Sequence, residues 1–351
     1  MSATTTTNSV RKRVLVRERL TPRRLVVTLV ALLVILLLFA IIALSVGSER
    51  VGLDVILKII ASQFTNKPGD IPAEQIAIIA DIRLPRVLTA IVVGAALSVA
   101  GAAFQALLRN PLADPGILGI STGSALGAIA ATIFAESIPV SRPLAAFISA
   151  VITMGLVYVI GQGRRGSSTD RLILAGVIVN SFLSSGVIYL VTASGSRLRS
   201  VFSWLIGDLG GEPKLLPITA ALVALGIFII FINSRSLNLL MTGEQESLAL
   251  GVEVKRVQIA VYVAASLITG AAVAIGGVIG FVGLIIPHAV RLAGGSDNRL
   301  VVPGSALAGA AFLLFADTVA RTVIAPLELH IGVITALVGA PAFVYLLRRT
   351  S

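Results

Sequence analysis

Long apolar runs, separated by short polar or glycine-rich breaks, make up most of the chain from residue 25 onward. The first run, 25–46, contains no charged residue, and about 20 residues at about 1.5 Å per residue cross a hydrocarbon core of about 30 Å. The runs are continuous rather than alternating, and a bilayer offers no water to backbone groups, so we predict α-helices instead of a barrel. The same criterion predicts ten spans: 25–46, 86–108, 116–135, 144–162, 171–193, 215–233, 256–276, 278–292, 301–325 and 331–347.

The boundary between the seventh and eighth predicted spans is weak. Only Gly276 and Gly277 separate the two runs, and the eighth run is short for a helix that crosses a bilayer alone. Two alternatives therefore stay open at this boundary, namely a total of nine spans or an arrangement of half-helices.

Composition places the chain among membrane proteins. Hydrophobic residues make up 56% of it, charged residues only 13%, and the mean hydropathy is +0.99, which excludes folding around one soluble core. The expected class is an all-α polytopic membrane protein. The first run is too long for the apolar part of a signal peptide, so we interpret it as a retained span. The chain has no cysteine, which excludes disulfides, thiolate metal sites and thiol catalysis.

The distribution of Lys and Arg predicts the orientation. With the N-terminus inside, most of the 28 basic residues fall in inner segments, and the formal net charge of +11 lies on that side. Short cytoplasmic segments concentrate basic residues, so both termini are predicted to be cytoplasmic. The basic segment 1–24 then serves orientation and contact with anionic lipid, and nucleic-acid binding is not expected. Residues 25–348 form a single transmembrane domain, which includes an inner loop over 234–254.

Catalytic signatures are weak. The sequence Gly119-Ile-Ser121-Thr-Gly123 fits a nucleophile elbow, but that motif needs a strand-to-helix turn and a His partner. With Gly127, these glycines instead lie at i, i+4 and i+8, a spacing that lets a neighbouring helix approach closely. We therefore expect helix packing and no catalytic residue. An intramembrane protease would require the opposite interpretation of Ser121.

Metal and nucleotide sites are not predicted in this chain. His288 and His330 lie far apart in the sequence, and neither has a carboxylate at ligand spacing, so no metal site is expected. The chain also lacks a G-x-x-x-x-G-K-[ST] phosphate loop. If ATP drives this protein, a separate subunit must hold the nucleotide and its magnesium.

Several motifs together resemble the permease family of iron-siderophore, haem and cobalamin ABC importers. The similarity covers nearly everything after the first span, and five segments carry it: Arg-Leu-Pro-Arg at 83–86, Arg-Asn-Pro-Leu-Ala-Asp-Pro-Gly at 109–116, Gly-Phe-Val-Gly-Leu-Ile-Ile-Pro-His at 280–288, Ala-Asp-Thr-Val-Ala-Arg at 316–321 and Gly-Ala-Pro at 339–341.

The resemblance implies a transporter subunit without enzymatic activity or a cofactor of its own. It would lie in the bacterial cytoplasmic membrane and pass a metal chelate, with a ferric siderophore expected first and haem or cobalamin as alternatives. The implied partners are a second permease subunit, identical or paralogous, two ATPase subunits that bind ATP and Mg, and an extracytoplasmic substrate-binding protein. A stand-alone secondary transporter is the other class, and it requires a buried ion site near the midplane.

Three arginines mark the predicted outer side. Arg83 and Arg86 bracket the start of the second span, and Arg321 follows Asp317 by four residues near the outer end of the ninth. Guanidinium groups bind carboxylates bidentately, and the resemblance implies that these three contact acidic residues of the binding protein. Asp317 and Arg321 could instead pair on one helix face, and Arg83 could pair with Asp81.

The inner loop 234–254 is predicted to contain a short helix. Thr242 and Gln245 fit a capping box, and Gly251 fits a C-terminal cap. Such a helix is marginal alone, so it needs a surface to pack on, either lipid or a groove of an ATPase subunit. The resemblance implies the ATPase contact, which we assign to Glu244, Glu246, Leu250 and Gly251.

The transport path is less well marked. Polar side chains in two spans either hydrogen-bond neighbouring helices or face a path. They are Asn180, Ser181, Ser184 and Ser185 in the fifth span and Thr335 in the tenth. The resemblance implies that these two spans line a path at a dimer axis. It also implies an inner gate at Asn110, Leu112 and the turn Ser167-Ser168-Thr169.

Overall fold

The computed structural model describes residues 21–47, 51–65, 71–134, 141–163, 166–167, 169–211, 213–325 and 327–350. Most of these residues lie in helices, and two strands of two residues each form an antiparallel pair. The elements are α1 (Pro22–Ser45), α2 (Leu53–Thr65), α3 (Ala73–Ile76), η1 (Ala77–Arg83), α4 (Leu84–Leu107), α5 (Ile120–Ile133), α6 (Arg142–Gly161), β1 (Gln162–Gly163), β2 (Gly166–Ser167), α7 (Thr169–Ala193), η2 (Gly195–Arg197), α8 (Leu198–Leu205), η3 (Pro213–Leu215), α9 (Leu216–Ile232), α10 (Ser234–Leu240), α11 (Glu244–Ala249), α12 (Val254–Gly276), α13 (Val282–Gly294), α14 (Asn298–Thr322) and α15 (Ile331–Thr350).

Each of the ten predicted spans coincides with a helix. Among the described residues, seven helices are long and apolar enough to cross a membrane, and α5, α13 and α15 are three shorter apolar helices. The weak boundary is a real break, because α12 ends at Gly276 and α13 begins only at Val282. Phe281 caps α13 with a φ of 70°, a conformation rare for a residue with a side chain. Because α13 has only 13 residues, the total of nine spans and the arrangement of half-helices both stay open.

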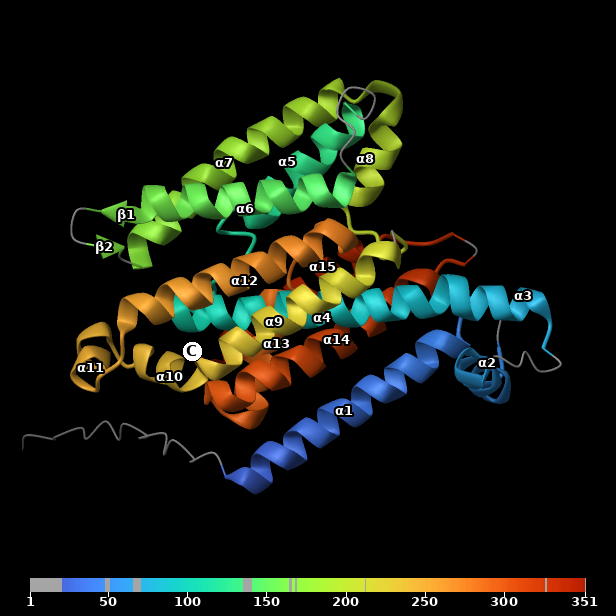
Figure 1. The fold of residues 1–351 in the computed structure, drawn as a ribbon, viewed down its shortest axis with the longest axis horizontal. Coiled ribbons are helices and arrows are strands. Elements are labelled where there is room, and N and C mark those ends of the chain that lie inside the picture. The colour runs from blue at the N-terminus through green and yellow to red at the C-terminus, as the bar shows by residue number, and fades with distance from the viewer. Residues whose placement is uncertain are drawn as a thin grey trace, which may run out of the picture.

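Short helices outside the spans were not predicted. In the described residues they are α2, α3, the π-helix η1 that leads into α4, α8, α10 and the short 3-10 helices η2 and η3. Their apolar residues are too few or too interrupted to form a run of bilayer length, so the criterion that found the spans passes over them. Two of them, α2 and α8, lie at the same end of the bundle (Figure 1).

Three helices form the centre of the bundle. α4 packs against α14, α12 and α13, and most of the residues of α4, α12 and α14 are buried. Glycines make this packing possible, because Gly94 of α4 faces Gly309 of α14 and Gly101 of α4 faces Gly283 of α13 at backbone contact. The predicted glycine packing is also present, since Gly123 and Gly127 of α5 abut α6. Gly119, however, caps that helix with a φ of 77° and is not part of its face.

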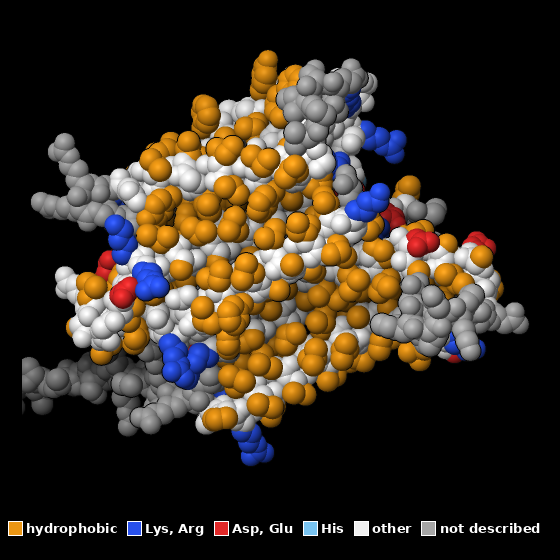
Figure 2. Space-filling view, viewed as in Figure 1, with side chains coloured by type: hydrophobic (Ala, Val, Ile, Leu, Met, Phe, Trp, Pro, Cys, Tyr) orange, Lys and Arg blue, Asp and Glu red, His pale blue; other side chains and the backbone are white. Residues whose placement is uncertain are grey.

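The outer helices leave apolar side chains uncovered in this single chain. α1, α7 and α9 are mostly exposed and strongly apolar. Figure 2 shows hydrophobic side chains over the middle of the molecule, with Lys, Arg, Asp and Glu gathered at its two ends. A belt of this kind is what a bilayer-spanning bundle presents to lipid or to partner helices.

The ends of the bundle match the predicted threading. The start of α1, the C-terminus, the β1–β2 pair, α10 and α11 lie at one end, and α2, α3 and α8 lie at the other (Figure 1). The segments predicted to lie inside therefore share one end, which we call the inner end. Most of the predicted segment 1–24 lies outside the described residues, and the assignment of this end to the cytoplasm stays a prediction.

Candidate functional site

The end of the bundle opposite the inner end, which we call the outer end, contains a network of charged side chains around the buried Asp317 of α14. The side chain of Asp317 is 0% exposed, and its carboxylate accepts hydrogen bonds from Arg86 Nε at 2.9 Å and from Arg321 Nε at 3.0 Å. Arg86 also donates from Nη1 to Glu328 Oε2 at 2.8 Å. Two arginines and two carboxylates thus neutralise one another across α4, α14 and the segment before α15.

Arg321 and a further arginine, Arg83, fasten α1 to the bundle. Arg321 donates from Nη2 to the carbonyl of Ala43 at 3.2 Å, and Arg83 donates from Nη1 to the carbonyl of Leu44 at 2.7 Å. Both carbonyls belong to the last turn of α1, where an α-helix leaves carbonyl groups without intrahelical donors. Arg83 and Arg321 are buried by these contacts.

The three arginines predicted to dock the binding protein differ in exposure. Arg83 and Arg321 are buried, and the alternative pairing of Asp317 with Arg321 is confirmed. Arg86 alone keeps partial exposure, with 16% of its side chain accessible. It borders a polar cavity of about 260 Å³, which Ser203, Asp208, Glu328 and His330 also line. The docking role itself stays a prediction.

The short helix α11 lies at the inner end as predicted, but its cap differs. Gly243 is the N-cap, and no side chain caps the helix. Thr242 instead donates its hydroxyl to the carbonyl of Leu239 at 2.7 Å, which closes the end of α10. The capping box is therefore wrong, because Thr242 serves the helix before it. The C-terminal cap is confirmed, since Gly251 has a φ of 80°.

One face of α11 is uncovered. Ser247 is buried and donates its hydroxyl to the carbonyl of Gly243, whereas Glu244, Glu246, Leu248 and Leu250 are exposed. Leu248 is 57% and Leu250 64% exposed. A helix of this length does not persist alone in water, so it needs a surface to pack on. Its exposed leucines, next to acidic side chains, offer the apolar contact for such a surface.

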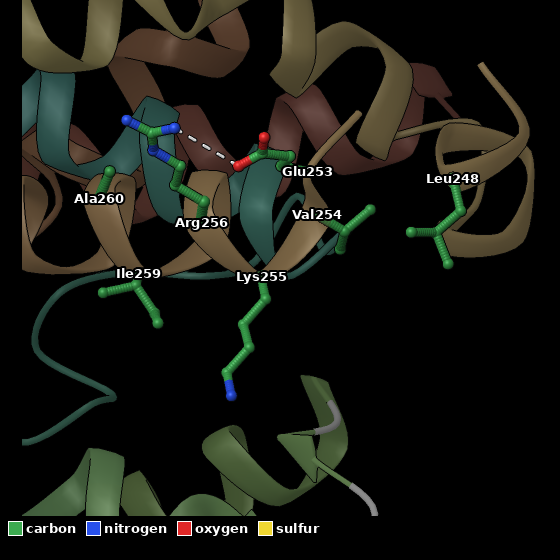
Figure 3. A pocket seen from close by; sticks show the side chains of 7 residues that line it. All are labelled: Leu248, Glu253, Val254, Lys255, Arg256, Ile259 and Ala260. Atoms are coloured by element: carbon green, nitrogen blue, oxygen red, sulfur yellow. Dashed lines mark hydrogen bonds and ion pairs between the residues drawn. The ribbon is translucent and has the colours of Figure 1, made fainter. Parts of the chain in front are cut away.

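A groove adjoins this helix at the start of α12. Its volume is about 670 Å³, and it is lined by Leu248, Glu253, Val254, Lys255, Arg256, Ile259 and Ala260. Figure 3 shows Arg256 paired with Glu253 on one side of α12, while Lys255 extends in another direction. The pair is 3.4 Å long and exposed on both sides, so it contributes little to stability. The groove combines an apolar floor with a charged rim.

A hydrogen-bonded link between α10 and the start of α14, at the inner end, was not predicted. Asn238 of α10 donates to Asp297 Oδ1 at 2.8 Å, and its own carbonyl oxygen accepts from the backbone and side-chain amides of Asn298. Burial acts to raise the pKa of Asp297, but hydrogen bonds from Arg299 and Asn238 outweigh burial and lower the pKa to about 2. The N-cap position of Asp297 before α14 was the available sequence signal.

The predicted path residues make different local contacts in the described part of the chain. Asn180 of α7 accepts a hydrogen bond from Thr122 of α5, so it links these two helices, and its place on a path stays a prediction. Asn110 accepts from the backbone amide of Leu112 at 2.9 Å, and Leu112 is exposed in the loop after α4. Thr335 is buried. Ser167 lies in β2, and Ser168 lies outside the described residues.

A polar contact between α4 and α13 was also missed. Gln105 donates from Nε2 to the carbonyls of Gly283 and Leu284, at 3.2 and 3.1 Å, and accepts from Arg291. Gln105 was visible in the sequence as a polar residue near the end of an apolar run. Its partners could not be identified there, because they lie far along the chain.

Comparisons with known proteins agree with this architecture. The profile of the FecCD transport family matches residues 33–349. The cobalamin import system permease protein BtuC of Halobacterium salinarum is 43% identical over 79% of this chain and 75% of its own length. The hemin transport system permease protein HmuU of Yersinia pestis is 40% identical over 77% of this chain and 82% of its own. A solved inward-facing structure, assigned to the metal-chelate type of ABC transporter, is 31% identical, covers 93% of this chain and 99% of its own, and has a TM-score of 0.79.

Proposed function

The chain belongs to the FecCD transport family and is an ABC importer permease, and we propose that it passes a metal chelate through the bacterial cytoplasmic membrane. The observation that carries this proposal is the match of 317 consecutive positions, 33–349, to one transport family. Its relatives are named for cobalamin and hemin, and the solved relative is assigned to the metal-chelate type. These cargoes share one chemistry, a metal enclosed by an organic ligand.

A ferric siderophore is the first candidate among such chelates. It shares with haem and cobalamin a metal that the organic ligand already coordinates, so the permease needs no metal ligands of its own. Cobalamin or haem is the second candidate, and the functions for which the two relatives are named favour it.

The energy source in this proposal is a pair of ATPase subunits that bind ATP and Mg at the inner end. The exposed face of α11 and the groove beside α12 support this placement, because they offer apolar side chains with a charged rim. Glu244, Glu246, Leu250 and Gly251 are the proposed coupling residues. ATP binding and hydrolysis would shift the permease between outward-open and inward-open states through this contact.

A second permease subunit, identical or paralogous, completes the proposed path. The exposed apolar face of α7, which carries Phe182 and Tyr189, supports a helix–helix contact there. Asn110, Leu112, Asn180, Ser167 and Ser168 remain the proposed gate and path residues. At the outer end an extracytoplasmic binding protein would dock, with Arg86 as the accessible member of the proposed arginine set.

Reconstitution with the partner subunits tests the proposal. Vesicles that contain the permease pair and the ATPases, with the binding protein on the outer side, should accumulate a radiolabelled chelate only when ATP is supplied inside. Inactivating the ATPases is the matched control and should abolish uptake. Parallel assays with a ferric siderophore, haem and cobalamin assign the cargo. Uptake without ATP that collapses with the proton gradient would instead indicate a secondary transporter.

A further inference from the structure

We propose that Glu328 is an internal substitute for the docking partner. In the free permease it forms an ion pair with Arg86, and on docking an acidic side chain of the binding protein replaces it in this pair. This inference rests on the proposed docking function and adds a residue and an exchange step to it. The partner group is a carboxylate of Asp or Glu at the tip of a docking surface.

The two carboxylates on Arg86 are not equivalent. Asp317 is fully buried and also holds Arg321, so its removal would take the carboxylate from the buried Arg321 guanidinium, which is strongly unfavourable. Glu328 is 53% exposed. An ion pair with one exposed member is weak, because water and salt screen it. Glu328 is therefore the partner that can leave.

The surroundings of Arg86 favour exchange over simple addition. The cavity of about 260 Å³ beside Arg86 has room for an incoming side chain. Glu328 and Asp208 both line this cavity, so a third carboxylate would meet two like charges at close range. Repulsion of this kind disfavours addition. An incoming carboxylate that replaces Glu328 keeps the number of charges around Arg86 unchanged.

Glu328 lies in the segment that connects α14 to α15. Its neighbours fasten this segment: the amide of Leu329 donates to the carbonyl of Ala320 at 2.9 Å, and His330 Nε2 lies 3.1 Å from Ser203 Oγ. When Glu328 leaves Arg86, the segment loses one more attachment just before Ile331 begins α15. Docking at the outer end would thus loosen the start of α15.

The test compares docking affinity among three single variants, Glu328→Gln, Arg86→Gln and Glu74→Gln, and the double variant that combines Arg86→Gln with Glu328→Gln. Glu74→Gln is the matched control, because Glu74 is an exposed carboxylate on α3 at the same end of the bundle. The carboxylates that pair with Arg86 are instead Asp317 and Glu328. Binding of the purified binding protein to the full permease in lipid nanodiscs is measured at low salt, where charge pairing is least screened. The size-exclusion profile of each variant verifies its folding.

If exchange occurs, Glu328→Gln should tighten docking by up to about fivefold, the range expected for losing one weak competing ion pair. Glu74→Gln should change it clearly less. In the Arg86→Gln background the gain from Glu328→Gln should vanish, because the two residues act on one contact. Equal effects of Glu328→Gln and Glu74→Gln, with docking weakened by Arg86→Gln, would overturn the exchange and leave the docking function standing. Docking unaffected by Arg86→Gln would overturn both.

Discussion

The contact between α4 and α13 supplies the sharpest prediction, the substitution Gly101→Ala. A Cβ atom at Gly101 would lie 1.9 Å from the carbonyl oxygen of Gly283 and 2.5 Å from its Cα. Ordinary contact begins at 3.4 Å, so the two backbones would have to separate by about 1.5 Å. Backbone atoms cannot rotate aside as a flexible side chain does, so the helices themselves must move.

The expected loss of stability follows from three terms. Overpacking against backbone belongs at the upper end of its usual range, about 3 kcal/mol. Separation of the helices also breaks the hydrogen bonds from Gln105 to Gly283 and Leu284, at about 0.6 kcal/mol each within a membrane. Replacing glycine by alanine inside a helix returns about 1 kcal/mol. The free energy of unfolding should therefore fall by about 3 kcal/mol.

Denaturant titration in mixed micelles measures this change. The chain has a single tryptophan, Trp204, which is buried, so its fluorescence reports the unfolding transition. Gly155→Ala in α6 is the matched control, because among the described residues nothing lies within 4 Å of the added Cβ. That variant should be neutral or up to about 1 kcal/mol more stable. A Gly101→Ala protein as stable as the Gly155→Ala protein would refute the close approach of α4 and α13.

The remaining predictions concern orientation, coupling and acid sensitivity. Single cysteines at Ser196 and Ser296 should react with membrane-impermeant reagents from opposite sides, Ser296→Cys from the cytoplasm only; labelling from the reverse sides would overturn the orientation. Leu250→Asp should leave folding intact, because Leu250 is exposed. It should sharply lower ATPase co-purification and the stimulation of ATPase activity by loaded binding protein, since the charge would be buried in the contact. Normal values of both would make α11 a lipid-facing helix only. The pKa of Asp297 is lowered from 3.8 to about 2, so its contribution to stability should be complete above about pH 4 and decline toward pH 2; Asp297→Asn should remove that part of the pH dependence of unfolding.

The sequence alone determined the class and the positions of the ten long apolar helices. In a bilayer each backbone group must be satisfied within its own segment, so an apolar run of sufficient length becomes a helix almost regardless of its neighbours. Ten such runs became ten helices. The family motifs were equally visible, because they are contiguous in the chain. Short amphipathic helices such as α2 and α8 were missed, since the length criterion does not apply to them.

The tertiary structure alone decided how the charged residues are used. Arg86 and Asp317 are separated by 231 positions, and Gln105 and Gly283 by 178. Which arginine meets which carboxylate depends on which helices are neighbours, and hydropathy carries no information about that choice. Close approach at Gly94 and Gly101 brings α4 against α14 and α13. That packing sets Arg86 beside Asp317 and buries Arg321, so three arginines of similar appearance in the sequence differ in exposure, because burial is a property of the assembled bundle.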